Sequence, residues 1–225
     1  MDARGNCAWF GGSPGTGKSY EALEYAKSRE KSIIIYDWTT NNVTYKQKIV
    51  PLDYLDLTLR PNEIVRIQDS EENFLEFVSK CHKISNATIV MDDCTSLFEG
   101  KIPKYFKQLL YKRKNQNLDF CLQFHTISDT PPAFLKACNL FFIKATSDSM
   151  PLKGTAPHRK HIEMLIEECY TENANYKSAE KWATRLFDIT DETIAVKDVK
   201  NPDFWASYKG KKTIYNYIKS KNNFK

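Results

Sequence analysis

Eight consecutive residues near the amino terminus match the pattern G-x-x-x-x-G-K-[ST], which is typical of a phosphate-binding loop. They are Gly12, Ser13, Pro14, Gly15, Thr16, Gly17, Lys18 and Ser19. Glycines at this spacing let backbone N–H groups turn inward around a β-phosphate, and the next helix adds its positive end. Lys18 is expected to reach the β- and γ-phosphates, and the Ser19 hydroxyl to bind Mg²⁺. The alternative is a glycine turn that precedes a lysine by accident. The apolar run before the motif and the helical pattern after it favour nucleotide binding.

A pair of acids follows a second apolar run, residues 87–91. A buried strand that delivers a carboxylate at its carboxyl end can hold Mg²⁺, usually through water, and Asp92 is the candidate for this role. Asp93 is then the candidate base that orients or deprotonates the attacking water. The alternative is that two aspartates merely end a strand in a polar loop. The phosphate-loop motif favours the metal site, with ATP and Mg²⁺ as the expected cofactors.

Short apolar runs alternate with helical patterns along most of the chain, which predicts an α/β fold with a mainly parallel sheet between helices. The expected strands are 7–10, 32–36, 63–67, 87–91, 119–125 and 140–144. The expected helices are 18–28, one capped by Ser70 that runs to Cys81, one from Pro103, and 132–137. After Met150 the pattern changes, and only 162–170 and 182–187 look helical. We therefore expect a core domain, 1–150, and a small carboxyl-terminal appendage, 151–225.

The phosphate loop, the paired acids and a later polar-ended strand resemble the additional-strand class of P-loop ATPases. Within that class, three stretches are the most informative: Tyr111 to Phe120, Cys121 to Thr126 and Pro131 to Leu140. They are similar to the FtsK/HerA superfamily, in particular to the genome-packaging ATPases of tailless, membrane-containing icosahedral viruses. The resemblance covers about residues 5–146.

The resemblance implies roles for residues beyond the phosphate loop. Arg113 occupies the place of a basic residue that commonly reaches a neighbouring subunit's nucleotide as an arginine finger. Arg66 and Arg159 are competing fingers, and a solvated surface charge is the ordinary alternative. His125 stands where relatives usually carry an amide that senses the γ-phosphate. A histidine there departs from the pattern, with a core histidine as the alternative and Gln123 as the fallback sensor.

The net charge of +5 is unevenly distributed. Six lysines and no acid lie in residues 206–225, and without these lysines the chain carries a net charge of −1. A second basic cluster comprises Lys101, Lys104, Lys107, Lys112, Arg113 and Lys114. In a ring-shaped motor such a cluster suits sequence-independent contact with DNA phosphates, although an exposed helix face kept soluble by lysine is the commoner case. The tail suits DNA, a capsid-vertex or membrane-protein partner, or plain solvation.

Composition narrows the class of protein. There is no apolar run of the roughly 18–20 residues that a membrane span needs, and no signal-peptide pattern. Six dispersed cysteines without a C-x-x-C pair favour reduced, mostly buried thiols. These features favour a protein of the host cytoplasm or associated with the virion.

The leading hypothesis is an ATPase that forms a homo-oligomeric ring and translocates DNA, most simply during viral genome packaging. The alternatives are a morphogenesis ATPase like those of filamentous phages, a helicase-loader-like ATPase, and a nucleotide-dependent switch with negligible turnover. A regulatory GTPase is disfavoured because no [NT]-K-x-D motif follows the phosphate loop.

Overall fold

The computed structural model describes residues 5–39, 44–98, 102–150, 152, 158–175, 183–191, 193–197 and 205–208. Lys101 and the basic tail from residue 209 onward lie outside these ranges, so the predictions made for them stay predictions. Of Trp205–Tyr208 only the backbone is described.

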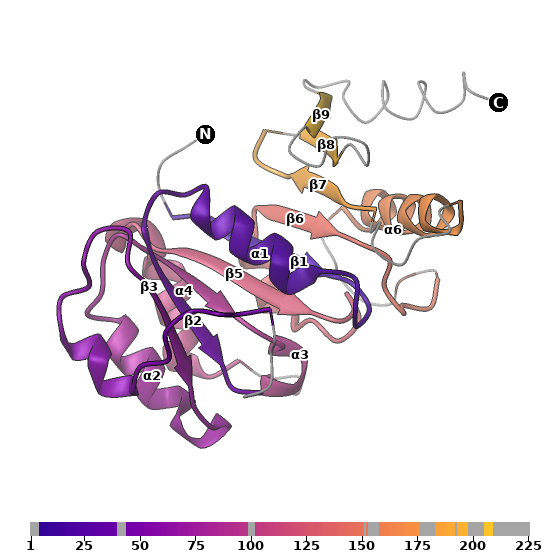
Figure 1. Cartoon of the computed structure of the whole chain (residues 1–225). Coiled ribbons are helices and arrows are strands. Elements are labelled where there is room, and N and C mark those ends of the chain that lie inside the picture. The colour runs from indigo at the N-terminus through magenta and orange to yellow at the C-terminus, as the bar shows by residue number, and fades with distance from the viewer. Residues whose placement is uncertain are drawn as a thin grey trace.

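The described strands form one sheet in the order β3-β2-β4-β5-β1-β6-β7-β8-β9 (Figure 1). The first six in this order are parallel: β3 Ile64–Gln68, β2 Ser32–Asp37, β4 Ala87–Met91, β5 Asp119–Phe124, β1 Cys7–Gly11 and β6 Leu140–Ile143. Strand β5 lies between β1, which leads into the phosphate loop, and β4, which leads into the paired acids. This is the additional-strand arrangement, and it confirms the predicted α/β fold.

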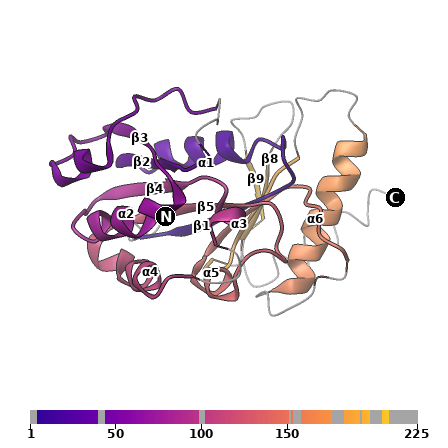
Figure 2. The same cartoon turned by 90° about the horizontal axis from the view of Figure 1, so that it is seen from below.

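The helices are divided unequally between the two faces of the sheet (Figure 2). Helix α1, Lys18–Lys27, packs on one face through Ala22, Leu23 and Ala26. The other face is covered by α2 Phe74–Cys81, α4 Lys104–Gln116 and α5 Pro132–Ala137. Helix α6 Arg159–Ala174 crosses the carboxyl end of β6, along the right-hand edge in Figure 2, and its first half packs against the same core. Because both faces are covered, the central strands are buried along their whole length and mostly apolar, as in the three isoleucines of β2, which are at most 2% exposed.

Short helical turns complete the described core. They are the 3₁₀ turns Leu52–Asp56 and Glu71–Asn73 and the four-residue helix α3, Cys94–Leu97. The expected cap at Ser70 precedes the second 3₁₀ turn, whereas α2 itself begins at Phe74, and the Ser70 side chain makes no capping bond. The expected buried thiols are confirmed, because all six cysteines are free and buried.

The chain beyond residue 150 continues the same sheet. Strands β7 Arg185–Asp188, β8 Thr193–Lys197 and β9 Trp205–Tyr208 pair antiparallel, starting on β6. The predicted helix over 182–187 is therefore wrong, because Leu186 and Phe187 lie in β7. The predicted helix over 162–170 is confirmed within α6. Residue 150 marks the change from parallel to antiparallel pairing, and the sheet runs across it.

Candidate nucleotide-binding site

The phosphate loop joins the carboxyl end of β1 to the start of α1. Gly15 and Gly17 have φ angles of 77° and 79°, in the left-handed region that favours glycine. The Ser13 N–H donates to the Ala145 carbonyl at 2.8 Å, and the Thr16 hydroxyl donates to the Ser13 carbonyl at 2.7 Å. The first bond anchors the loop to the segment after β6, and the second closes a turn within the loop.

Lys18 lies folded over its own loop. Its ammonium donates to the Gly12 carbonyl at 2.6 Å and to the Ser13 carbonyl at 3.2 Å. Burial lowers the pKa of Lys18 to about 8, and the nearby charges of Asp92 and Asp93 oppose that shift. A phosphate beside this ammonium would favour its charged form, so the lysine is suited to bind an anion in the same place.

Ser19 and Asp92 come together at the floor of the site. The Ser19 hydroxyl lies 3.1 Å from Asp92 Oδ1 and 3.0 Å from Gln123 Oε1, and Asp92 is only 6% exposed. A hydroxyl and a buried carboxylate are the oxygen donors that Mg²⁺ prefers, so this pair fits the ion. Within the described part of the chain, no three His, Cys, Asp or Glu side chains gather into a metal-binding group. Phosphate and water would supply the remaining ligands.

Asp93 and His125 form a second pair beside Lys18. His125 Nε2 lies 3.2 Å from Asp93 Oδ1, and His125 Nδ1 lies 3.3 Å from Lys18 Nζ. The neighbouring His125 imidazole is the main cause that holds the pKa of Asp93 below its ordinary value.

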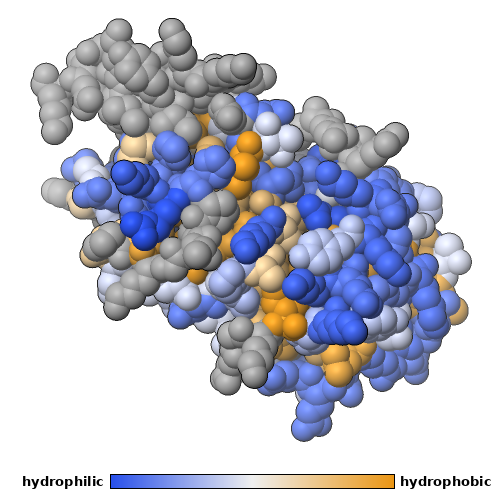
Figure 3. Space-filling model, turned by 180° about the vertical axis from the view of Figure 1, so that it is seen from behind, coloured by the Kyte–Doolittle hydropathy of each residue, from blue (hydrophilic) through white to orange (hydrophobic). Residues whose placement is uncertain are grey.

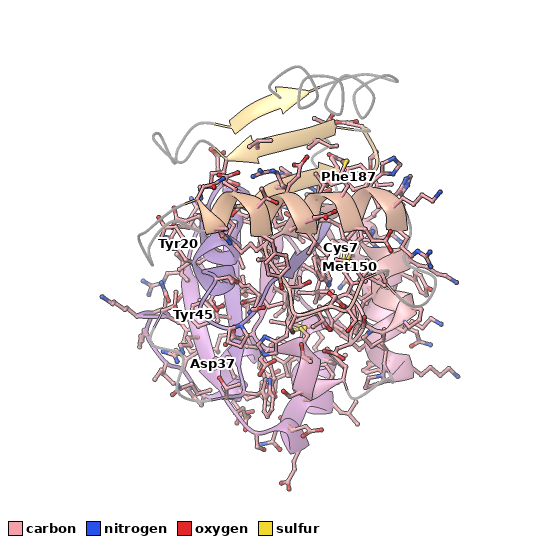
Figure 4. The ribbon with its side chains drawn as sticks, turned by 90° about the vertical axis from the view of Figure 1, so that its right-hand side faces the viewer. Cys7, Tyr20, Asp37, Tyr45, Met150 and Phe187 are labelled. Atoms are coloured by element: carbon pink, nitrogen blue, oxygen red, sulfur yellow. The ribbon has the colours of Figure 1, made fainter. Side chains whose placement is uncertain are left out.

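A pocket of about 200 Å³ unites these groups. It is lined by Pro14, Gly15, Lys18, Ser19, Thr39, Asp92, Asp93, Gln123 and His125. It lies at the carboxyl edge of the parallel strands, the edge that faces the viewer in Figure 4. The motif positions thus converge on one cavity, and the structure places His125 at its wall instead of in the core.

The three candidate arginines lie elsewhere. Arg113 donates to three backbone carbonyls, of Gly5, Leu110 and Ala137. Arg66 is 7% exposed and pairs with Asp37 while it donates to the Tyr45 carbonyl. The side chain of Arg159 is 42% exposed and pairs with Glu163. The arginine-finger role stays a prediction, and the bonds of Arg113 and Arg66 count against those two residues.

Three polar residues of the site were missed from the sequence: Thr39, which lines the pocket, and Tyr45 and Thr95, which support it. Tyr45 is 2% exposed, and its hydroxyl accepts from Gln123 Nε2 at 2.6 Å and lies 3.4 Å from Asp92 Oδ1. The Thr95 hydroxyl accepts from the His125 N–H at 2.9 Å. Tyr45 follows β2 in a polar stretch without periodicity, so no local signal separated it from a loop tyrosine. Thr95 stands two residues after Asp93, which was its only signal.

No protein-family model matches the chain, and no curated protein sequence matches it. Solved structures do match it. The genome packaging NTPase B204 from Sulfolobus turreted icosahedral virus 2, in complex with ATP-γS, aligns with a TM-score of 0.62 at 16% identity, over 87% of this chain and 98% of that one. The DNA-packaging ATPase B204 from Sulfolobus turreted icosahedral virus aligns with a TM-score of 0.59 at 16% identity, over 86% of this chain and 97% of that one. The described strands, the phosphate loop and these alignments together show that the chain has the fold of a P-loop ATPase, in the form that these viral packaging ATPases share.

Proposed function

We propose that this protein is an ATPase that works as a homo-oligomeric ring and moves DNA, in the manner of a viral genome-packaging motor. The observation that carries the proposal is the convergence of Lys18, Ser19–Asp92 and Asp93–His125 on one pocket. The shared fold of solved packaging ATPases supports it.

In the proposed reaction the side chains of the pocket take distinct roles. Lys18 exchanges the Gly12 carbonyl for a phosphate oxygen, while the N–H groups of the loop surround the β-phosphate. Ser19 and Asp92 hold Mg²⁺, which would neutralise charge on the β- and γ-phosphate oxygens. Asp93 accepts a hydrogen bond from the attacking water. His125 favours the anionic form of Asp93 and is the candidate γ-phosphate sensor, which would donate to that phosphate through whichever ring nitrogen carries a proton.

The exposed face of α4 is the proposed DNA contact. Its exposed residues are Lys104, Tyr105, Lys107, Gln108, Tyr111, Lys112, Lys114 and Asn115, and the helix contains no acid. Lysines suit phosphate contact without sequence readout, and exposed tyrosines suit stacking on bases. Hydrophilic residues dominate the side of the molecule opposite α1, to which α4 belongs (Figure 3).

The partners of the carboxyl-terminal tail belong to the same proposal. A capsid-vertex or membrane-protein partner for the lysines from residue 209 onward rests on the sequence alone, because these residues lie outside the described ranges. Among the helices that the structure describes, none is long and apolar enough to cross a bilayer. A site of action in the host cytoplasm or on the virion accords with the packaging proposal.

ATP turnover with and without DNA tests the proposal, with Lys18→Ala and the exposed-site control Lys160→Ala, and with native mass spectrometry to confirm a ring. We expect hydrolysis that DNA stimulates, that Lys18→Ala abolishes and that Lys160→Ala leaves unchanged. Lys18→Ala removes the cation that contacts the phosphates, whereas Lys160 is exposed near the start of α6.

Two results would contradict the motor. A strict monomer with ATP and Mg²⁺ rules out a finger supplied by a neighbour. A verified ring that binds ATP without turning it over, with or without DNA, favours a nucleotide-dependent switch instead.

A further inference from the structure

Tyr20 is an exposed aromatic residue on the first turn of α1, directly after Ser19. It is 55% exposed, yet the ammonium of Lys197 in β8 lies 5.9 Å from the centroid of its ring. A cation at that distance attracts an aromatic ring. In Figure 4 the Tyr20 label lies on the α1 side of the carboxyl edge, between Tyr45 and the antiparallel strands.

Lys197 is itself held in place by a buried carboxylate. Its ammonium lies 2.8 Å from Glu21 Oε2, and Glu21 is 5% exposed. Lys144 Nζ lies 3.8 Å from the same oxygen and donates to the Thr184 hydroxyl at 2.6 Å. The ring of Tyr20 therefore packs beside a charge that belongs to a buried network of α1, β8 and the segment after β6.

The pocket gathers groups suited to phosphates and Mg²⁺: the residues of the phosphate loop, the paired acids and the polar carboxyl end of β5. Lys18, Asp93 and His125 mark the place of the terminal phosphate, and the first N–H groups of α1 face the phosphates that precede it. The nucleoside must then extend across the first turn of α1, where Tyr20 is the exposed side chain.

We infer that Tyr20 and Lys197 form the base-binding platform of this site, with the Tyr20 ring stacked on a purine base and Lys197 holding the ring. The inference rests on the proposed nucleotide function. Stacking on an aromatic ring does not depend on the hydrogen-bonding groups at the edge of the base, so this platform accepts adenine and guanine alike. It also gives the carboxyl-terminal strands a part in substrate binding, since Lys197 comes from β8.

Calorimetry on the full chain tests the platform with two probes, MgATP and magnesium tripolyphosphate, which lacks the nucleoside. We expect Tyr20→Ala to weaken MgATP binding about tenfold, because stacking on an aromatic ring contributes substantially for each base. Its affinity for tripolyphosphate should not change. Tyr20→Phe should retain the affinity for MgATP, and so should the control Tyr170→Ala, which removes an exposed tyrosine of α6.

The possible outcomes separate the two proposals. If Tyr20→Ala weakens both probes equally, or neither, the platform is overturned while the nucleotide site stands. If the wild-type chain binds neither probe, the proposed function fails and the platform with it. A Tyr20→Trp variant gives a second measurement: its added fluorescence should change with MgATP and not with tripolyphosphate, and a response to both overturns the platform.

Discussion

At Lys18, burial and nearby charges act in opposite directions. The loop carbonyls and the surrounding protein bury its ammonium, and burial lowers its pKa to about 8, against the opposing effect of Asp92 and Asp93. In the free protein Lys18 is therefore part charged and part neutral near pH 8. A bound triphosphate favours the charged form, so the pKa of Lys18 is higher in the complex than in the free protein.

This difference predicts proton uptake on nucleotide binding. At a pH between the pKa of Lys18 in the free protein and its higher pKa in the complex, binding of MgATP must take up a proton. The affinity for MgATP should therefore fall as the pH rises above about 8. Calorimetry at pH 8.5 in two buffers of different ionisation enthalpy measures the uptake. Lys18→Arg is the control. Its guanidinium stays charged in the free protein and in the complex, so this variant should show no proton uptake. Equal enthalpies in both buffers for the wild-type chain would contradict the prediction.

At the scale of elements, Arg113 joins three segments. Its guanidinium donates to the carbonyls of Gly5 before β1, Leu110 in α4 and Ala137 at the end of α5. The resemblance assigned Arg113 a role at a neighbour's nucleotide, whereas these bonds give it a structural role within the chain. Sequence could not separate the two roles, because an arginine near a helix end has the same local pattern in both.

Arg113→Gln distinguishes these roles. We expect it to lower the free energy of unfolding by about 1–3 kcal/mol, because buried carbonyls lose their donors. Arg159→Gln, at an exposed ion pair, should change it by less than about 0.5 kcal/mol. Urea denaturation measures the free energy of unfolding of both variants, and the ATP turnover of the assembled protein is measured in parallel. If the Arg113→Gln variant instead keeps its stability and loses ATP turnover, the result supports the arginine-finger role of Arg113.

The elements of the parallel half were predictable because each carries a complete local signal. The three isoleucines of β2 indicate a strand covered on both faces, and the phosphate-loop motif fixes the turn between β1 and α1. In contrast, Tyr45 and Thr95 reach the site through tertiary contacts alone. Strand β7 was misread for a similar reason: Arg185 to Asp188 is a four-residue strand, too short to show an alternation that a helix could not also give.

At the scale of the whole molecule, the antiparallel strands cover the edge of β6. The register sets Phe141 opposite Phe187 and Phe142 opposite Leu186. Helix α6 buries Ile162, Leu165 and Ile166 against the same core that α2, α4 and α5 also cover. The part of the chain that was expected to be an appendage thus completes the core, and Lys197 links it to α1 through Glu21.

A chain that ends at residue 150 should therefore fail to reach the native packing. It loses Ile162, Leu165, Ile166, Phe187 and Ile194 from the core, all of them fully buried. Each contributes about 1.5–3 kcal/mol by burial, and together they match the roughly 5–15 kcal/mol that stabilises a typical domain. We expect weak near-ultraviolet circular dichroism and binding of a hydrophobic dye, which mark lost side-chain packing. A chain that ends at Tyr208 keeps all nine described strands, and it should unfold cooperatively and bind MgATP as the full chain does. If the 150-residue chain instead unfolds cooperatively and binds MgATP normally, residues 1–150 are an independent domain after all.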